Sequence, residues 1–217
     1  MARMARSERR DAIVEAALAV ARRKGLGATS VRDVAREMGS SSGLIHHYFD
    51  SMDDVLAAAF ERIAGEDLTQ TEIMLDDADE PREVIAEFLR SYAPVGDDWA
   101  FQLWLDAWAE AARRPHLREA SSRLNLAWAA LLERTIRAGV ADGSFRCGDP
   151  AAAAWRILSL VDGLALQVVA HQTIVDRADM LAWAAAAAES ELGLANGALG
   201  VGHATPLAAP LATPPRA

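Results

Sequence analysis

The sequence predicts an all-α protein, and three observations support that prediction. Apolar residues recur every three or four positions through most of the 217 residues, which is the spacing of one helix face. Prolines and glycines fall between these segments, where they favour the starts and ends of helices. Convincing runs of alternating apolar and polar residues, which would indicate half-buried strands, are absent from the sequence.

Residues 30–49, SVRDVAREMGSSSGLIHHYF, predict two short helices joined by a tight turn. Ser30 and Asp33 have the spacing of a capping box, and Gly39 can adopt the positive φ that ends the first helix. Ile45 and Phe49 lie on the buried face of the second helix. The opposite face carries small and polar side chains, with two larger ones at its edges: Ser42, Gly43, His46 and His47, then Leu44 and Tyr48.

To read the major groove of DNA, a protein needs a short helix that a neighbouring helix holds in place and that presents small, polar side chains outward. The same pattern also fits an ordinary surface helical hairpin. Charge favours the first interpretation. Residues 1–49 contain nine basic and five acidic side chains, whereas the remaining 168 contain 13 basic and 26 acidic ones. A basic segment within an acidic protein is typical of a local polyanion-binding region.

Residues 9–60 resemble the DNA-binding domain of the TetR family of bacterial transcriptional regulators. The resemblance rests on the first-helix pattern of Ile13, Ala16, Ala17 and Val20 before Gly25, and on the SVRDVAREMG and SGLIHHYF segments at the family's spacing. It implies a sequence-specific, DNA-binding regulator. The implied contacts to bases and backbone fall on Ser41, Ser42, Gly43, Leu44, His46, His47 and Tyr48, and Ser30 and Arg32 would lie against phosphates.

Four arginines at the N-terminus have two interpretations: they form an arm on the DNA, or they belong to a disordered, solubilising terminus. These are Arg3, Arg6, Arg9 and Arg10. Ser40 and Met52 depart from the family pattern, which often has Val and usually Lys at these positions. The Lys contacts the DNA backbone in the family. An alternative function is therefore a small-molecule-binding helical scaffold whose helix-turn-helix no longer reads DNA.

The sequence indicates no enzyme, cofactor or metal site. Nucleophile motifs such as GxSxG, the zinc motif HExxH and glycine-rich phosphate loops are absent. His46 and His47 are adjacent on a helix, so their side chains diverge by about 100° and cannot chelate one ion together. The single cysteine, Cys147, excludes an intramolecular disulfide. We expect a cytoplasmic protein, because no signal peptide or sufficiently long apolar span is evident.

Beyond residue 50 the chain reads as helix throughout. Breakers and capping residues predict helices over 51–76, 81–93, 98–113, 116–141, 150–171 and 176–192. Residues 194–217 contain four prolines and three glycines and predict a disordered tail. We therefore expect a DNA-binding domain over 1–50 and a larger effector-binding and dimerisation domain over 51–193.

Residues 85–172 resemble the C-terminal domain of the BetI-type subgroup of this family, through WLDAWAEAARRPHLREA, LLERTIRAGVADGSFRCGDPAAAA and LVDGLALQ. The helix over 150–171 is apolar nearly all round, so it must be covered on both sides. It is either a central helix within one subunit or, as the family implies, one of two helices, with 176–192, in a two-fold homodimer interface. A dimer would present two recognition helices to palindromic operator DNA.

Tryptophans crowd the two helices between residues 98 and 141. Helically spaced tryptophan is more often core than part of a ligand site. The alternative is an effector pocket between these helices, where members of the family bind small molecules. Tryptophan faces beside carboxylates would suit a cationic effector. The candidate residues are Trp104, Trp108, Trp128, Asn125, Asp162 and Gln167. The expected function is a homodimeric repressor that the effector releases from its operator.

Overall fold

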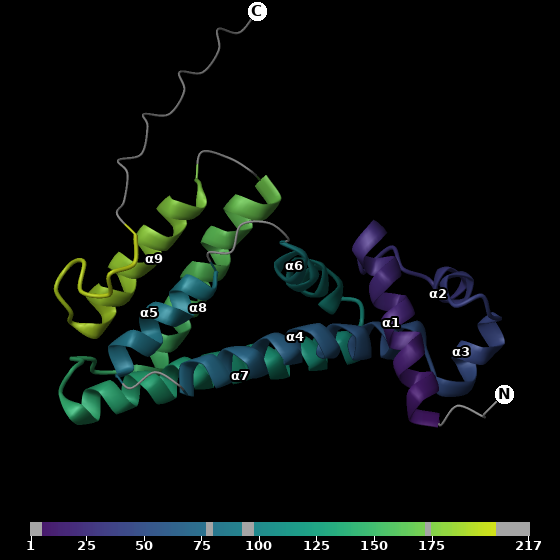
Figure 1. Ribbon diagram of the computed structural model, residues 1–217, viewed down its shortest axis with the longest axis horizontal. Coiled ribbons are helices and arrows are strands. Elements are labelled where there is room, and N and C mark those ends of the chain that lie inside the picture. The colour runs from purple at the N-terminus through teal and green to yellow at the C-terminus, as the bar shows by residue number, and fades with distance from the viewer. Residues whose placement is uncertain (1–5, 77–79, 93–97, 172–174, 203–217) are drawn as a thin grey trace, which may run out of the picture. The chain divides into compact units, whose positions relative to one another are not determined.

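A computed structural model of the chain describes residues 6–76, 80–92, 98–171 and 175–202. Within these ranges every regular element is a helix and no residue lies in a strand, which confirms the all-α prediction. The elements, drawn in Figure 1, are α1 (Arg6–Lys24), α2 (Val31–Glu37), α3 (Ser42–Tyr48), α4 (Met52–Asp76), α5 (Pro81–Ser91), α6 (Trp99–Ala111), α7 (Pro115–Asp142), α8 (Pro150–Leu166), the π-helical turn η1 (Gln167–His171) and α9 (Arg177–Leu192).

The chain divides into two compact units. Unit 1 comprises Met1–Ala78 and Val95–Arg134, and unit 2 comprises Asp79–Pro94 and Thr135–Ala217. Unit 1 extends beyond the expected DNA-binding domain because α4 packs against both α1 and α6. The expected functional boundary after residue 50 therefore stays a prediction.

The first four helices of unit 1 enclose one apolar core. Ile13 of α1, Val34 of α2, Ile45 of α3 and Val55 of α4 are each at most 1% exposed. Because α3 has only seven residues, it cannot be stable alone, and these contacts hold it against its neighbours. Figure 1 shows α2 and α3 side by side next to α1.

The turn between α2 and α3 forms as the sequence predicts. Ser30 is the N-cap of α2, and the side chains of Ser30 and Asp33 bond to each other's backbone N–H groups in a capping box. Gly39 has a φ of +61°, a conformation that favours glycine, and Ser41 is the N-cap residue of α3.

In unit 2, α9 packs against both α8 and α5. Asp149 and Asp176 cap α8 and α9, and each accepts a hydrogen bond from the backbone N–H three residues ahead. Where the sequence predicts one helix over 150–171, the regular α-helix ends at Leu166 and continues as the π turn η1. By length and composition alone, Pro150–His171 is apolar enough to cross a membrane, as are core helices of many water-soluble proteins.

The segment 194–202, expected to begin a disordered tail, is ordered against α9. The buried carboxylate of Glu189 accepts hydrogen bonds from the N–H groups of Gly197 (2.8 Å) and Leu199 (2.9 Å). Leu199 and Val201 are buried. Composition alone missed this segment because its order depends on one buried acceptor in the preceding helix. Residues 203–217 lie outside the described residues.

Candidate DNA-binding and effector sites

The outward face of α3 has most of the exposure that its sequence predicts. Ile45 is 1% exposed and Phe49, just after the helix, is 3% exposed, so both anchor α3 to the core. Of the side chains predicted to face outward, Gly43, His46 and His47 are exposed, but Ser42 is half-buried, as are the two predicted edge residues Leu44 and Tyr48. The exposed N-cap residue Ser41 makes no side-chain capping bond.

Gly43 leaves the surface of α3 open. A Cβ atom at this position would meet nothing closer within the chain than the hydroxyl of Ser41, at 3.8 Å. Internal packing therefore does not require a glycine here. Because Gly43 has no side chain, another molecule can come close to the helix backbone next to exposed His46 and His47.

The two departures from the family pattern both lie in packed surroundings. Met52, at the start of α4, is half-buried and packs against the core of the first four helices. The hydroxyl of Ser40 is buried and has no hydrogen-bond partner. Met52 therefore contributes to packing, whereas the lysine that is usual in the family would contribute a charge. Ser40 lies at a position that would also accept an apolar side chain.

At the start of α2, Ser30 is already engaged by its own chain. Its N–H and hydroxyl both contact the Asp33 carboxylate, which also pairs with Lys24 of α1. The ion pair with Lys24, followed by the bond from Ser30, lowers the pKa of Asp33 to about 2. Asp33 is therefore ionised at any physiological pH and fixes the junction of α1 and α2, whereas Arg32 is exposed.

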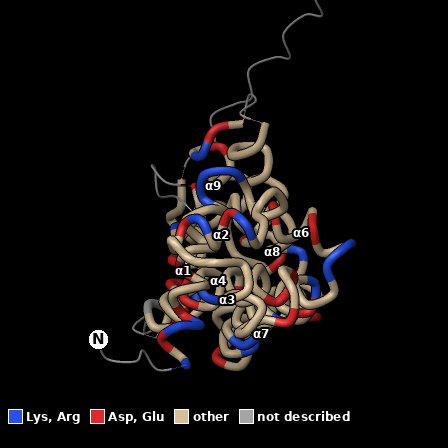
Figure 2. Tube along the Cα trace, turned by 90° about the vertical axis from the view of Figure 1, so that its right-hand side faces the viewer, with Lys and Arg blue, Asp and Glu red and all other residues tan. Residues whose placement is uncertain are grey.

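Figure 2 shows that basic and acidic residues are mixed along α1 and α2. The helix α3 itself contains no Lys, Arg, Asp or Glu. Of the four N-terminal arginines, Arg6, Arg9 and Arg10 belong to α1, and Arg3 lies outside the described residues. Among the described residues no group of three His, Cys, Asp or Glu side chains is arranged to hold a metal ion.

The six predicted effector residues are divided between the units. Four of them belong to unit 1: Trp104, Trp108, Asn125 and Trp128. Asp162 and Gln167 belong to unit 2, in α8 and η1.

In unit 1, the tryptophans of α6 belong to an aromatic cluster. The Trp104 ring meets the Phe60 ring edge-on at 4.8 Å between centroids, and lies 5.6 Å from Trp108. Trp104 and Trp128 are 8% and 6% exposed, respectively. Trp108 and Asn125 are half-buried and are the more accessible members of the predicted set.

In unit 2, Asp162 combines burial with an aromatic neighbour. Burial raises the pKa of this carboxyl from 3.8 to about 7, and a hydrogen bond with Tyr92 acts in the opposite direction. The Tyr92 ring packs edge-on against Phe88 at 5.5 Å, and Arg177 of α9 donates to the Tyr92 carbonyl at 3.1 Å. Tyr92 was missed by the sequence analysis, because only the fold brings the end of α5 next to α8.

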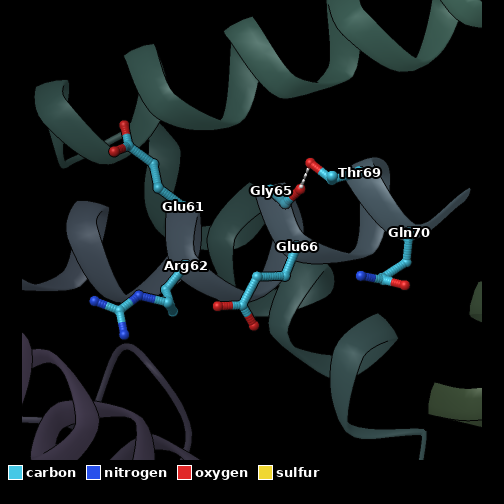
Figure 3. Close-up of a pocket in the computed structure, with 6 residues that line it drawn as sticks. All are labelled: Glu61, Arg62, Gly65, Glu66, Thr69 and Gln70. Atoms are coloured by element: carbon cyan, nitrogen blue, oxygen red, sulfur yellow. Dashed lines mark hydrogen bonds between the residues drawn. The ribbon is translucent and has the colours of Figure 1, made fainter. Parts of the chain in front are cut away.

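A shallow crevice of about 330 Å³ runs along α4 and contains none of the predicted effector residues. Its lining is polar: Glu61, Arg62, Gly65, Glu66, Thr69 and Gln70 (Figure 3). Arg62 pairs with Asp11 and Glu15 of α1, and Glu61 pairs with Arg123 of α7. The crevice is thus a gap beside surface ion pairs.

The helix α6 holds the loop between α1 and α2 through a carboxylate. Asp106 Oδ2 accepts a hydrogen bond from the Leu26 N–H at 2.6 Å, and a Cβ atom at Gly25 would lie only 3.1 Å from the same oxygen. Gly25 has a φ of +85°, so both its conformation and its close approach to α6 favour glycine. Asp106 lies two residues from both Trp104 and Trp108, and therefore on the far side of α6.

Two family models match the chain. The model for bacterial regulatory proteins of the tetR family matches residues 13–59, and the model for the C-terminal domain of BetI-type transcriptional repressors matches residues 81–193. The regulator BetI of Rhizobium meliloti is 30% identical over 167 residues, which cover 72% of this chain and 75% of BetI. The repressor KstR2 of Rhodococcus jostii is 29% identical, over 70% of this chain and 76% of KstR2.

Solved structures agree with these matches. A regulator from Saccharomonospora viridis, solved in complex with choline, superposes with a TM-score of 0.74 at 27% identity, over 82% of this chain and 94% of that chain. A regulator from Pseudomonas aeruginosa superposes with a TM-score of 0.76 over 88% of this chain and 93% of that one. At 23% identity, the second likeness concerns the fold alone.

Proposed function

The chain belongs to the TetR family of bacterial transcriptional regulators, and we propose that it is a homodimeric repressor that a small-molecule effector releases from a palindromic operator. The observation that carries this proposal is the outward face of α3. Its exposed side chains are small or polar, and its buried side chain, Ile45, anchors it to the core. Regulators of this family are bacterial DNA-binding proteins, so we place the protein in the cytoplasm, and we propose no enzymatic activity.

We assign the DNA contacts to both helices of the helix-turn-helix. Bases and nearby backbone would meet Ser41, Ser42, Gly43, Leu44, His46, His47 and Tyr48, and phosphates would meet Ser30 and Arg32. Leu44 can contact a thymine methyl, and histidine and serine can bond to base edges or phosphates. Because the capping box already engages Ser30, Arg32 is the more available of these two phosphate contacts.

Replacement of His46 by alanine, or of Tyr48 by phenylalanine, is expected to weaken operator binding. Loss of one base-edge contact costs about 1–3 kcal/mol, or roughly 5- to 150-fold in affinity. Fluorescence anisotropy on a labelled operator duplex measures the change, and sedimentation confirms that the oligomer is intact. Glu66→Ala, an exposed change on α4, is the control and should bind normally. A change of oligomeric state in either variant would instead give α3 a structural role.

The homodimer is proposed to form through α8 and α9. One side of α8 is buried within its own unit, but Trp155 and Leu160 on its other side are 39% and 37% exposed. Ser159, which lies between these two residues in the sequence, and Gly163, which follows them, are also exposed. Because both are small, a second helix could approach α8 closely. An apolar helix face of this kind supports the interface interpretation over that of a central helix within one subunit.

The effector is proposed to be a small cation that binds near Asp162, with Gln167 as a further polar contact. A carboxylate beside the ring of Tyr92 offers both electrostatic and cation–π attraction. The π turn η1, which contains Gln167, directly follows α8, and such turns are common at functional sites. The tryptophan set of unit 1, Trp104, Trp108 and Trp128 with Asn125, stays a separate candidate site for an effector. Choline, the ligand of the Saccharomonospora viridis regulator, is a suitable first probe.

Effector binding is proposed to act on the DNA-binding helices through α4, with α6 as a second route. A ligand must favour the state that does not fit DNA in order to change the separation of the two recognition helices. The bond from Leu26 to Asp106 ties α6 directly to the loop before α2. Displacement of α6 on its tryptophan side would therefore move that loop.

Replacement of Asp106 by alanine is expected to loosen this connection. The N–H of fully buried Leu26 would lose its acceptor, so its amide hydrogen should exchange faster, by about tenfold or more. Release of operator by choline should become smaller. Asp106→Asn keeps an acceptor oxygen and is the matched control, with nearly normal behaviour. Unchanged exchange and release in Asp106→Ala would exclude α6 as a route.

The alternative function is a small-molecule-binding scaffold that does not read DNA. The absence of a lysine at position 52 and the packed role of Met52 are the observations that favour it. Salt dependence separates the two functions, because specific DNA binding weakens steeply as salt concentration rises.

A further inference from the structure

The end of the recognition helix is held by a side chain from another helix. The helix α3 has two turns, and after Tyr48 the chain turns to the extended conformation at Phe49, with φ −137° and ψ 134°. The last carbonyls of a helix have no partner within it and need another donor. Arg10 of α1 supplies one, because its Nη1 atom donates to the Tyr48 carbonyl at 3.0 Å.

The same guanidinium also lies over an aromatic ring of the core. The Arg10 Cζ atom is 4.0 Å from the centroid of Phe49, which is itself 3% exposed. The planar group therefore makes two contacts at once, one to the last peptide of α3 and one to the residue that anchors it. A cation at this end of a helix also interacts favourably with the helix dipole.

Fixing the Tyr48 peptide fixes the last turn of α3. That turn presents His46 and His47, and the rings of His47 and Tyr48 meet edge-on at 5.0 Å. The first turn lacks a side-chain cap from Ser41, so the described contacts restrain the end of α3 more than its beginning. The direction in which the two histidines point thus depends on the arginine.

We propose that Arg10 is a positioning residue for DNA recognition: it orients the last turn of α3, and its charge is not a phosphate contact. This inference rests on the proposed function of α3 as the DNA-reading helix. It replaces, for this one arginine, the interpretation of the N-terminal arginines as an arm on the DNA.

Three variants distinguish positioning from a phosphate contact. Arg10→Met removes the hydrogen bond, the stacking and the charge. Arg10→Lys keeps the charge but loses the planar group that stacks on Phe49 while it donates to Tyr48. Arg6→Met is the matched control, because it removes an equal charge from the same face of α1, one turn earlier.

Operator affinity is measured for each variant at several salt concentrations. We expect Arg10→Met and Arg10→Lys both to bind about tenfold more weakly than the wild type, with an unchanged slope of log affinity against log salt. Amide exchange in 45–49 should accelerate in both, and Arg6→Met should leave that exchange unchanged. A phosphate contact predicts the reverse: a slope smaller by about one in Arg10→Met, and near-normal binding by Arg10→Lys.

Two further results separate this inference from the proposed function. If the wild type binds no operator, the proposed function fails. Faster amide exchange at residues 45–49 in the Arg10 variants would still show that Arg10 holds the end of α3. If Arg10→Met fails to fold, Arg10→Lys still tests the inference, through the salt dependence of its operator affinity and through its amide exchange. Normal exchange in Arg10→Lys together with normal affinity overturns the inference.

Discussion

Replacement of Trp155 by glutamate is expected to turn the proposed dimer into a monomer. The side chain lies on the exposed apolar side of α8, so the two-fold axis of a dimer would bring two uncompensated charges into one interface. Operator affinity should then fall by at least about a hundredfold, because a single recognition helix engages only one half-site. Sedimentation at micromolar concentration measures the mass, and anisotropy measures the affinity.

Leu126→Glu is the matched control for this prediction. Leu126 of α7 is 57% exposed and lies outside α8 and α9, so the same chemical change should leave the dimer and operator binding intact. A Trp155→Glu protein that remains dimeric would contradict the proposed interface. Dissociation of the Leu126→Glu protein alone would instead place the interface on α7.

Replacement of Asp162 by asparagine is expected to abolish binding of a cationic effector and to change how stability depends on pH. Burial raises the pKa of Asp162 to about 7. Between its ordinary pKa of 3.8 and this value, the folded protein binds more protons than the unfolded chain. The free energy of unfolding therefore falls as the pH rises through this window. At higher pH the contribution of Asp162 no longer changes.

Asparagine removes this ionisation, so the variant should be more stable than the wild type at pH 8, by up to about 4 kcal/mol. The difference should disappear toward pH 4. Urea unfolding at several pH values measures both quantities. In the wild type, choline affinity should increase as the pH rises through 7, because the cation needs the carboxylate; calorimetry on the variant should detect no binding. Equal choline binding by the two proteins would exclude Asp162 as the anchor.

The sequence predicted the features that depend on neighbouring residues. Pro81 is a local signal for a first helical residue, and Asp149 and Asp176 are local capping signals. In the structure one helix begins at Pro81, and two others begin directly after the two aspartates. The buried and exposed faces of α3 follow from helical periodicity around Ile45 and Phe49 alone. The fold class and much of the candidate DNA-binding face could therefore be predicted.

Features that depend on long-range contacts could not be predicted. The hydrogen bond from Leu26 to Asp106 joins residues 80 positions apart, and that from Arg10 to the Tyr48 carbonyl joins residues 38 apart. Neither side chain carries a local pattern that distinguishes it from a solvated surface charge. The ordered segment after α9 depends on a nearer contact, the buried carboxylate of Glu189, which composition alone does not indicate.

The central claim is that the protein reads a palindromic operator, and selection from a random DNA pool tests it most directly. The protein is first unfolded and refolded to remove any bound small molecule, and bound duplexes are then selected at near-physiological salt and sequenced. We predict an enriched palindrome whose half-sites are separated by about one helical turn or a multiple of it. No enrichment from the refolded protein would contradict the claim and favour the ligand-binding scaffold.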